Sequence, residues 1–544
     1  MAHSLRFLAR RTLLSAADVL ATSPLVRWTW TGPANDDQIA ALSEFRPTDR
    51  ETVLEMMQGR FLLASKLVDT HGNSPFDLDV DHADWLDDLQ TFAWLRHFRD
   101  GRGSAERGFA RRLTLDWIER EGQFNRDTWT PSLTARRVLN WLRHYQILVE
   151  GAAEDEHHTI GRALSTQVAS LRLRSMVADD PTDRLLVAIA LVAVALCGDA
   201  PRAEIEARIG AMQRLIDRQF DADGLHLSRS ARIQLQLLVE LDTIRLAMQR
   251  DFEQQSLDLG QATDRMHGAL DAVSLGTGEP GYFNGTGQLP HDIIVAVQAQ
   301  SPIRARETRS TGGYGRLIAG ETVVVADSGL VPPPQFAARA HAGDLGFEFS
   351  HGRDLIVCNC GPAPSGYSEA EVFRQGIAHS APTIDSMSAA ALPESGPFAG
   401  RVLQLGRPAE LEIDAAEASI VMRCHGYAER FGISIERQLS LLTDGKTLVG
   451  QDKLIRHRPR ASGTMVVRFH LAPLTSVEPL EDLVRLRLGS GATWTFLWEG
   501  ATMRTEDSVR QSAYFGFHRT QQIVLEVPVA QAGEIHWIFT KEEA

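Results

Sequence analysis

The chain has 544 residues, of which 43% are hydrophobic and 23% are charged, and its formal net charge is -14 at pH 7. These fractions are typical of a folded globular protein, and the length exceeds what one compact core usually holds, so more than one domain is expected. The acidic balance argues against a general nucleic-acid-binding protein, because phosphate backbones are held by basic faces. It leaves room for a local basic groove that holds an acidic sugar.

No disulfide framework and no membrane span are expected from the sequence. The cysteines are Cys197, Cys358, Cys360 and Cys424. They are too few and too irregularly spaced for a disulfide scaffold, and Cys358 and Cys360 are too close for an easy mutual disulfide. The apolar run 185–197 is too short to cross a bilayer and predicts a buried helix. The amino terminus is a poor export signal, because Asp18 interrupts the apolar run behind its arginines.

Helical periodicity dominates the first half of the chain. Residues 1–50 are a mixed lead-in, after which apolar residues recur at three- and four-residue spacing. The predicted helices cover residues 84–98, 110–119, 134–148, 160–173, 183–197, 205–220, 233–249 and 254–272. Many successive helices with short links predict paired helices in a toroid or a solenoid. No sequence repeat of fixed period stands out, which disfavours a regular solenoid.

The pattern changes near residue 300. Short strands separated by turns are predicted at residues 322–326, 345–349, 355–358, 419–424, 433–439, 464–471, 484–488, 494–498, 523–527 and 535–539. Such a series predicts an antiparallel β-sandwich. The predicted fold class is therefore a multidomain α and β chain, with an N-terminal (α/α) toroid followed by a C-terminal antiparallel β-sandwich. The predicted limits are a lead-in over 1–50, a toroid over 51–300 and a sandwich over 301–544.

One predicted hairpin gathers chemically active side chains. Its strands are joined by a turn at His351-Gly352. The chain carries His341 and Asp344 before the hairpin, Cys358, Asn359 and Cys360 at its end, and His379 further on. His341 and His379 could be two ligands of a divalent metal, with Asn359, Cys360 or Asp344 completing the site. The alternative is that these are satisfied structural residues, since a Cys-x-Cys pair lacks the spacing of a zinc knuckle.

A second candidate lies at the start of the helix predicted over 134–148. Arg136, Asn140 and Arg143 stand at i, i+4 and i+7, near one face of that helix. An arginine beside an asparagine could hold a carboxylate. The alternative is an ordinary solvated helix face.

Three further candidates lie in loops. His226, in the polar loop 221–230, is either a base or charge-neutralising donor, or part of a turn with a capping serine. The Gly-rich segment 281–287 contains Tyr282 and Asn284 but lacks the strand–helix context of a phosphate loop. Tyr314 is flanked by glycines that allow a close approach of the backbone to a ligand, and it could equally be a hydrogen-bonded junction residue.

Taken together, these segments resemble the heparinase II/III-like family of polysaccharide lyases. The resemblance is carried in chain order by Trp94-Leu95-Arg96-His97, Trp129 with Arg136-Arg137 and Asn140-Trp141, Asp223-Gly224-Leu225-His226-Leu227-Ser228-Arg229-Ser230, Tyr314-Gly315-Arg316-Leu317, Ala340-His341-Ala342-Gly343-Asp344-Leu345-Gly346-Phe347-Glu348 and His379-Ser380. It implies an (α/α) toroid followed by a β-sandwich, with the active cleft between them. It also implies cleavage of an acidic, uronate-containing polysaccharide by β-elimination.

The chemistry implied by the resemblance has three needs. Donors must hold the uronate carboxylate, a base must remove the proton on the adjacent carbon, and an acid must protonate the leaving oxygen. The implied catalytic candidates are His226, Tyr314 and Tyr282. The implied substrate-binding residues are Arg136, Asn140, Asn284 and Arg339. The implied ligands of one divalent metal ion, zinc, are His341, His379, Asn359 and Cys360. No organic cofactor is expected.

The chain departs from the family's pattern at several of these positions. Ile233 stands where the family often has an acid/base tyrosine, and Arg339 stands at the first position of its His-x-His-x-Asp motif. The aspartate of that motif is displaced to Asp344, and Asn359 replaces an aspartate that can bind zinc. The alternative function is therefore a catalytically impaired protein that binds an acidic glycan, with Arg339 gripping a carboxylate. A hydrolase is disfavoured, because no convincing Asp/Glu pair stands in the matching segments.

The expected partner is an acidic polysaccharide or oligosaccharide, and not a nucleic acid. The resemblance suggests the cell envelope or periplasm, whereas the poor export signal suggests the cytoplasm. The sugar, the linkage, endo or exo action and the oligomeric state do not follow from the sequence.

Overall fold

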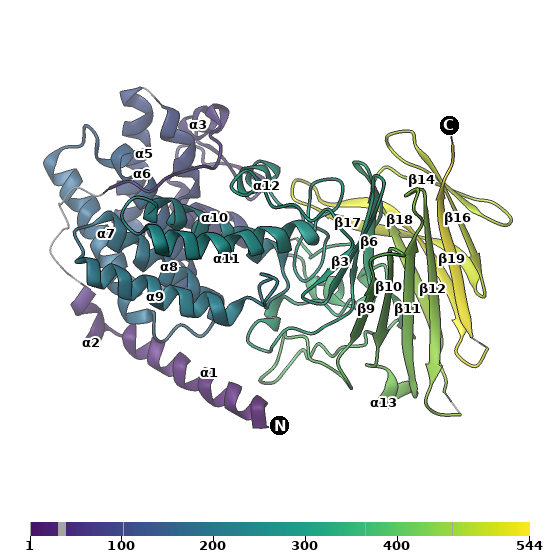
Figure 1. Ribbon diagram of the computed structural model, residues 1–544. Coiled ribbons are helices and arrows are strands. Elements are labelled where there is room, and N and C mark those ends of the chain that lie inside the picture. Colours follow the sequence, from purple (N-terminus) through teal and green to yellow (C-terminus); the bar gives the residue numbers. More distant parts are fainter. Residues whose placement is uncertain are drawn as a thin grey trace. The chain divides into compact units, whose positions relative to one another are not determined.

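The computed structural model describes residues 2–30, 40–101, 103–364, 366–459, 461–531 and 533–543 (Figure 1). Residues 31–39 of the predicted lead-in lie outside the described residues. The chain divides into two compact units. The first, here called the helical unit, comprises Met1–Phe220, Gln236–Asp264 and Val295–Ser301, and the second, the sandwich unit, comprises Asp221–Leu235, Arg265–Ile294 and Pro302–Ala544. The predicted domain limits at residues 50 and 300 stay predictions.

Every helix predicted from residue 110 onward is confirmed. The long helices are α1 (Ala2–Ala21), α5 (Ser104–Glu121), α6 (Pro131–Val149), α7 (Glu154–Arg174), α8 (Pro181–Cys197), α9 (Arg202–Gln219), α10 (Ala231–Met248) and α11 (Glu253–Ala272). The shorter elements are α2 (Pro24–Arg27), α3 (Arg50–Met57), α4 (Ala83–Thr91), α12 (His291–Gln298) and a hairpin of β1 (Arg60–Leu63) and β2 (Lys66–Asp69). Helix α1 was not predicted. It is tied to α7 by an ion pair between Asp18 and Arg174 at 2.7 Å.

Helix α6 is central to the helical unit, because it packs against α5, α7 and α8. Its start follows from local chemistry: the Thr130 hydroxyl accepts a hydrogen bond from the Leu133 N–H at 3.3 Å, and Pro131 occupies the first helical turn. Its apolar face, which includes Val138, Trp141 and Tyr145, is buried as its periodicity predicts.

The prediction of one helix over residues 84–98 is wrong in its second half. Helix α4 ends at Thr91, Phe92 takes a left-handed backbone with φ 58°, and a 3-10 helix runs from Ala93 to Asp100. The Phe92 ring is fully buried and contacts the rings of Trp117 and Trp141 edge-on. Burial of this ring among aromatic neighbours offsets the backbone cost of leaving the helix.

The sandwich unit contains two antiparallel sheets, as predicted. One has the strand order β14 (Ser476–Pro479), β15 (Val484–Arg487), β16 (Thr493–Glu499), β19 (Glu534–Lys541), β12 (Thr447–Arg456), β11 (Ile433–Leu441), β10 (Ser419–Cys424) and β9 (Glu410–Asp414). The other has the order β17 (Thr502–Ser512), β18 (Gly516–Pro528), β13 (Thr464–Leu471), β7 (Asp354–Cys358), β6 (Phe347–His351), β5 (Thr322–Asp327), β4 (Tyr314–Ala319) and β3 (Arg309–Thr311), with β8 (Pro382–Ile384) paired to β13. Figure 1 shows the two sheets packed as layers.

An aromatic core lies between these sheets. Phe347 from β6 and Trp537 from β19 stack with ring centroids 5.4 Å apart and an interplanar angle of 10°. Both side chains are essentially buried, and the inward residues of β11 alternate with outward ones. The predicted hairpin around His351-Gly352 is confirmed as β6 and β7. The hairpin lies between the segment that contains Arg339 and His341 and the segment that contains Asn359 and Cys360.

Two further features concern the state of the cysteines and the length of the apolar helices. Cys197, Cys358, Cys360 and Cys424 are all buried free thiols. Among the helices of the described residues, none is both long and apolar enough to cross a bilayer.

Candidate functional site

Tyr314 is held in a closed hydrogen-bond network of the sandwich unit. Its hydroxyl donates to the Arg229 carbonyl at 2.7 Å and accepts from the Asn284 amide at 2.6 Å. The Arg229 guanidinium lies 4.2 Å from the Tyr314 ring centroid and pairs with Asp327 at 2.7 Å. Burial raises the pKa of Tyr314 well above its ordinary value, so the phenol stays protonated. In this arrangement the hydroxyl is a structural hydrogen-bond donor.

Asn284 connects this network to His341. The Asn284 amide group also donates to Asp327 at 3.2 Å, and its oxygen accepts from the His341 backbone N–H at 3.1 Å. The next residue, Gly285, has φ +76°, and a Cβ there would lie 2.9 Å from the Arg339 carbonyl. The exposed Arg339 therefore lies beside the Asn284 loop. The structure brings these two predicted substrate-binding residues close together.

His341 and His379 form a directed pair. The His379 Nδ1 lies 2.8 Å from the Gln375 carbonyl, which can only accept, so that nitrogen carries the proton. The His379 Nε2 is then an acceptor, and the His341 Nδ1 donates to it at 3.1 Å. Burial lowers the pKa of both imidazoles below the ordinary value, which keeps them neutral. This order leaves the Nε2 of the half-buried His341 as an unprotonated acceptor.

Arg437, which is buried in an ion pair with Asp452, supports the two segments that carry Asp344 and His379. Arg437 donates through Nη1 to the carbonyls of Leu345 and Ser380, at 2.9 and 3.0 Å. These residues directly follow Asp344 and His379. Asp344 is 7% exposed and accepts from the Cys424 thiol at 3.7 Å, and burial raises its pKa to about 7. Arg437 thus positions the segments that carry His379 and Asp344.

His226 is buried in a bonded turn. Its Nδ1 accepts from the Ser228 backbone N–H at 3.1 Å and lies 2.7 Å from the Ser228 hydroxyl. Its ring packs edge-on against Phe336, and burial lowers its pKa to about 3. The imidazole is therefore neutral at ordinary pH and is part of the turn, as the alternative reading of this loop predicts.

Tyr282 is also packed inside the sandwich unit. The Arg510 guanidinium lies 3.9 Å from its ring centroid, the side chain is 3% exposed, and burial raises the pKa of its phenol. Glu348 is fully buried in the same cluster. Burial raises the pKa of Glu348 as well. Tyr282 and Tyr314 are therefore two enclosed phenols, and their catalytic roles stay predictions.

The four predicted metal ligands do not form one set. The Asn359 side chain donates to the Tyr282 carbonyl at 3.3 Å and accepts from the Ser380 N–H at 2.8 Å. The Cys360 thiol lies 3.6 Å from the His470 Nδ1. Among the described residues, no three His, Cys, Asp or Glu side chains are arranged to hold a metal ion. The residues as arranged do not fit a zinc ion, and metal binding stays a prediction.

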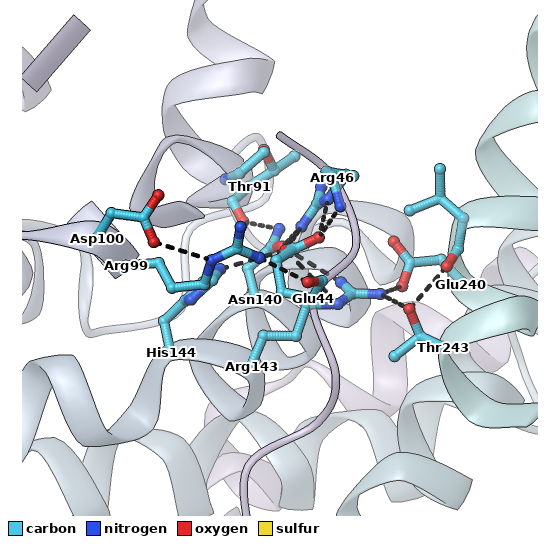
Figure 2. A network of polar contacts seen from close by, with 12 residues as sticks. Glu44, Arg46, Thr91, Arg99, Asp100, Asn140, Arg143, His144, Glu240 and Thr243 are labelled. Atoms are coloured by element: carbon cyan, nitrogen blue, oxygen red, sulfur yellow. Dashed lines mark hydrogen bonds and ion pairs between the residues drawn. The ribbon is translucent and has the colours of Figure 1, made fainter. Parts of the chain in front are cut away.

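Arg136 and Asn140 belong to the helical unit, where both are bonded to the protein. Arg136 donates to the Gln236 side chain at 2.8 Å. Asn140 is 2% exposed, donates to the Thr91 carbonyl at 2.8 Å and accepts from Arg46 at 2.9 Å. Figure 2 shows Asn140 enclosed by Thr91, Arg46 and Arg143. Arg143, on the face of α6 that was predicted to hold a carboxylate, already lies 4.0 Å from one, that of Glu44.

Two sets of charged residues in these networks were not predicted from the sequence. Asp327 ends the apolar strand β5, and a carboxylate directly after a buried strand was a usable signal. Glu44 and Arg46 lie in a segment without helix or strand, so no periodicity pointed inward.

The comparisons with known proteins agree with this architecture. Residues 305–538 match the family model described as heparinase II/III-like, C-terminal. The chain is 26% identical over 491 residues to FtsZ-localized protein C of Caulobacter vibrioides, a match that covers 86% of this chain and 82% of that protein. A solved structure of heparinase III has a TM-score of 0.71 at 12% identity, covering 98% of this chain and 91% of that one. The heparan sulfate lyase HepC from Pedobacter heparinus has a TM-score of 0.58 at 14% identity, covering 98% and 88%.

At these identities the solved structures show the fold alone. They confirm the predicted fold class of a helical toroid followed by an antiparallel β-sandwich. The family model covers strands β3 to β18 and the first part of β19, and it includes Tyr314, His341 and His379. The resemblance seen in the sequence is therefore confirmed as a match of residues 305–538 to the heparinase II/III-like, C-terminal, family model.

Proposed function

We propose that the protein is a polysaccharide lyase-like enzyme that cleaves a uronate-containing glycan by β-elimination, with His341 as the base. The observation that carries this proposal is the chain of donors from His341 to His379 to the Gln375 carbonyl. It fixes both tautomers and leaves a neutral, half-buried imidazole with its Nε2 lone pair available. A neutral, oriented imidazole is a suitable general base near pH 7.

The proposed reaction is an elimination that moves one proton from carbon, forms one double bond and breaks one glycosidic bond. His341 Nε2 takes the proton from the carbon next to the uronate carboxylate, a carbon–carbon double bond forms, and the bond to the glycosidic oxygen breaks. That oxygen takes up a proton as it leaves, either returned by the His341 imidazolium or supplied by water, so that every proton is accounted for. The exposed Arg339 beside the Asn284 loop supplies the charge that holds the carboxylate and acidifies the neighbouring C–H. Tyr314 can supply the leaving-group proton only by releasing the Arg229 carbonyl.

The proposal is tested by ultraviolet absorbance, because elimination leaves a conjugated unsaturated uronate that absorbs. The purified chain is incubated with alginate, heparan sulfate, hyaluronan and bacterial exopolysaccharides, with and without added zinc. We expect absorbance to rise with one of them, and His341→Gln to abolish the rise. His425→Gln is the matched control, since His425 is also a buried histidine of the sandwich unit, bonded to Ser434 at 3.0 Å. A flat trace across the panel with folded protein contradicts a lyase.

A second candidate is a protein that binds an acidic glycan without cleaving it. Two predicted site residues support it. The Tyr314 hydroxyl and the Asn140 amide both make their hydrogen bonds to other groups of the protein. Ile233 also supports a binding function, because it stands where the family often has an acid/base tyrosine. Saturable binding of one of the panel glycans without any absorbance change would establish this function. Absence of binding to all of them would exclude it.

The name of the Caulobacter vibrioides relative bears on location. We propose that this chain, too, localises with FtsZ, which favours the cytoplasm over the cell envelope. A fluorescent fusion expressed in its own cells, imaged with and without depletion of FtsZ, tests this. Signal that stays at the same positions after depletion would contradict the proposal.

A further inference from the structure

Residues 40–49 of the helical unit, here called the Glu44 segment, form neither helix nor strand, yet they insert two charged side chains into the unit (Figure 2). The side chains of Glu44 and Arg46 are 3% and 7% exposed, whereas Ser43 and Pro47, which flank the two residues in the chain, are exposed. Burying a charge is costly unless it is paired, so the partners of Glu44 explain the insertion.

The Glu44 carboxylate is surrounded by donors. Arg46 donates to its two oxygens through Nε at 2.8 Å and Nη2 at 2.5 Å. From helix α6, His144 Nε2 lies 3.3 Å and Arg143 Nε 4.0 Å from Glu44 Oε2. Both of these nitrogens are buried and without a hydrogen bond in the described part of the chain. Two buried nitrogens of α6 therefore face the Glu44 carboxylate without completing a hydrogen bond to it.

The charges of this cluster balance only with Glu44 in place. Arg143 pairs with Glu240 of α10 at 2.5 Å, which leaves Arg46 to be neutralised by Glu44. Burial by itself raises the pKa of Glu44, but Arg46, His144 and Arg143 together hold it well below its ordinary value. Without the Glu44 carboxylate, Arg46 would keep an uncompensated, buried positive charge.

The Glu44 segment is fastened by side chains near its ends. Arg99 Nη1 donates to the Glu44 carbonyl at 2.5 Å, Thr48 bonds to Asp100, and the Asp49 N–H donates to His97 Nδ1 at 3.0 Å. Asp49 and Asp100 are exposed, and Thr48 is partly exposed. A segment held by a few partly exposed side-chain bonds, without a strand ladder, opens locally at lower cost than a helix or a strand.

We propose that the helical unit contains a carboxylate-binding site, built by Arg143 and His144 of α6, which the chain fills with its own Glu44. A carboxylate ligand competes with Glu44 for this site and enters when local opening withdraws the Glu44 carboxylate from Arg143 and His144. The site stands on the geometry alone, and only the identity of the ligand as a uronate rests on the proposed function.

The test uses small carboxylates with the full chain. Sodium acetate and sodium glucuronate are titrated against sodium chloride at equal ionic strength, and thermal unfolding is followed. We expect Glu44→Ala to gain a saturable stabilisation from both carboxylates, with a half-saturating concentration at least tenfold below any response of the unsubstituted protein. Adding Arg143→Ala to Glu44→Ala should remove this gain. A Glu44→Ala variant that responds like the unsubstituted protein would overturn the proposal and leave Glu44 as a purely structural ion-pair partner.

Two controls keep the test decisive. Glu412→Ala removes a glutamate that also pairs with an arginine, Arg423 at 2.6 Å, but is 65% exposed, and it should gain no carboxylate response. If Glu44→Ala does not fold, Glu44→Gln keeps the side-chain shape without the charge and should bind glucuronate about tenfold more tightly than the unsubstituted protein; equal affinity would overturn the proposal. Free glucuronate has no glycosidic bond to cleave, so this outcome is independent of whether the protein is a lyase.

Discussion

Arg437 and Asp452 form a bidentate ion pair that is sealed inside the β-sandwich. Arg437 Nε and Nη2 donate to the two carboxylate oxygens at 2.6 and 2.8 Å, and neither side chain is exposed. The Trp537 indole N–H donates to the same carboxylate at 2.9 Å, and the remaining Arg437 nitrogen reaches the carbonyls beside Asp344 and His379. The pair therefore links the aromatic core to the candidate site.

Removing one member of this pair should be far more damaging than removing both. Arg437→Met leaves the Asp452 carboxylate buried without its cation and two carbonyls without a donor, so the free energy of unfolding should fall by about 3–5 kcal/mol. The double variant Arg437→Met with Asp452→Leu should lose less, since no charge is left buried. Thermal and urea unfolding of the three proteins, followed by near-UV circular dichroism, measures this. A double variant as unstable as the single one would contradict the account.

Asp344 should make the protein less stable as the pH rises. Its pKa is raised to about 7, chiefly by burial, so the folded protein keeps its proton in a range where the unfolded chain has released it. Its stabilising contribution is complete below the unfolded pKa of about 3.9 and is lost as the pH rises through 7. Asp344→Asn, which cannot ionise, should be more stable than the unsubstituted protein above pH 7, by up to about 4 kcal/mol. The measurement is the unfolding temperature of both proteins from pH 4 to 8, and a difference independent of pH would contradict the shift.

His226 should have the opposite dependence on pH. Its pKa is lowered to about 3 by burial, so the unfolded chain binds a proton below pH 6.5 while the folded protein does not. Its contribution is complete above pH 6.5 and is lost as the pH falls towards 3. His226→Gln should lose about 1–3 kcal/mol at pH 7 through the Ser228 hydrogen bond, and this loss should shrink at pH 5. A loss that is the same at pH 7 and pH 5 would show that the imidazole is not held neutral.

Much of the fold followed from the sequence because periodicity reports burial. The helices from residue 110 onward and the β6–β7 hairpin were predicted from apolar spacing alone. The same reasoning failed at Phe92, because the 3.6-residue spacing continues through a position where the backbone turns left-handed. The spacing of apolar residues shows which residues face inward. It does not show a change of backbone conformation when the same residues stay buried.

The candidate site followed only in part, and the reason is hydrogen bonding. The sequence brought His341 and His379 together as metal ligands, and the structure brings them together as a directed pair of imidazoles. Asn359 was grouped with them because it stands at the end of the same predicted hairpin, but its amide is used by the backbone of Tyr282 and Ser380. Asn140 was predicted to face a ligand, and it faces Arg46, which lies 94 positions earlier in the chain. Which partner a polar side chain meets depends on the folded path of the chain, which local spacing does not contain.

Gly450 is required by the ring of Trp537, its cross-strand partner in the β12–β19 pair. A Cβ at Gly450 would lie 2.0 Å from the Trp537 Cζ2, closer than atoms can approach, so the ring rests directly on the glycine backbone. Gly450→Ala must push the indole off Phe347 and away from Asp452, and should cost about 1–3 kcal/mol of unfolding free energy. Combining it with Trp537→Leu should add little to the cost of Trp537→Leu alone, because the clashing ring is gone. Thermal unfolding of the four proteins forms the cycle. Additive effects of the two substitutions would show that the glycine is needed for some other reason. The matched control is Gly491→Ala, also at a glycine of this unit, where a Cβ meets no atom within 4 Å but φ is +93°; it separates backbone strain from the clash.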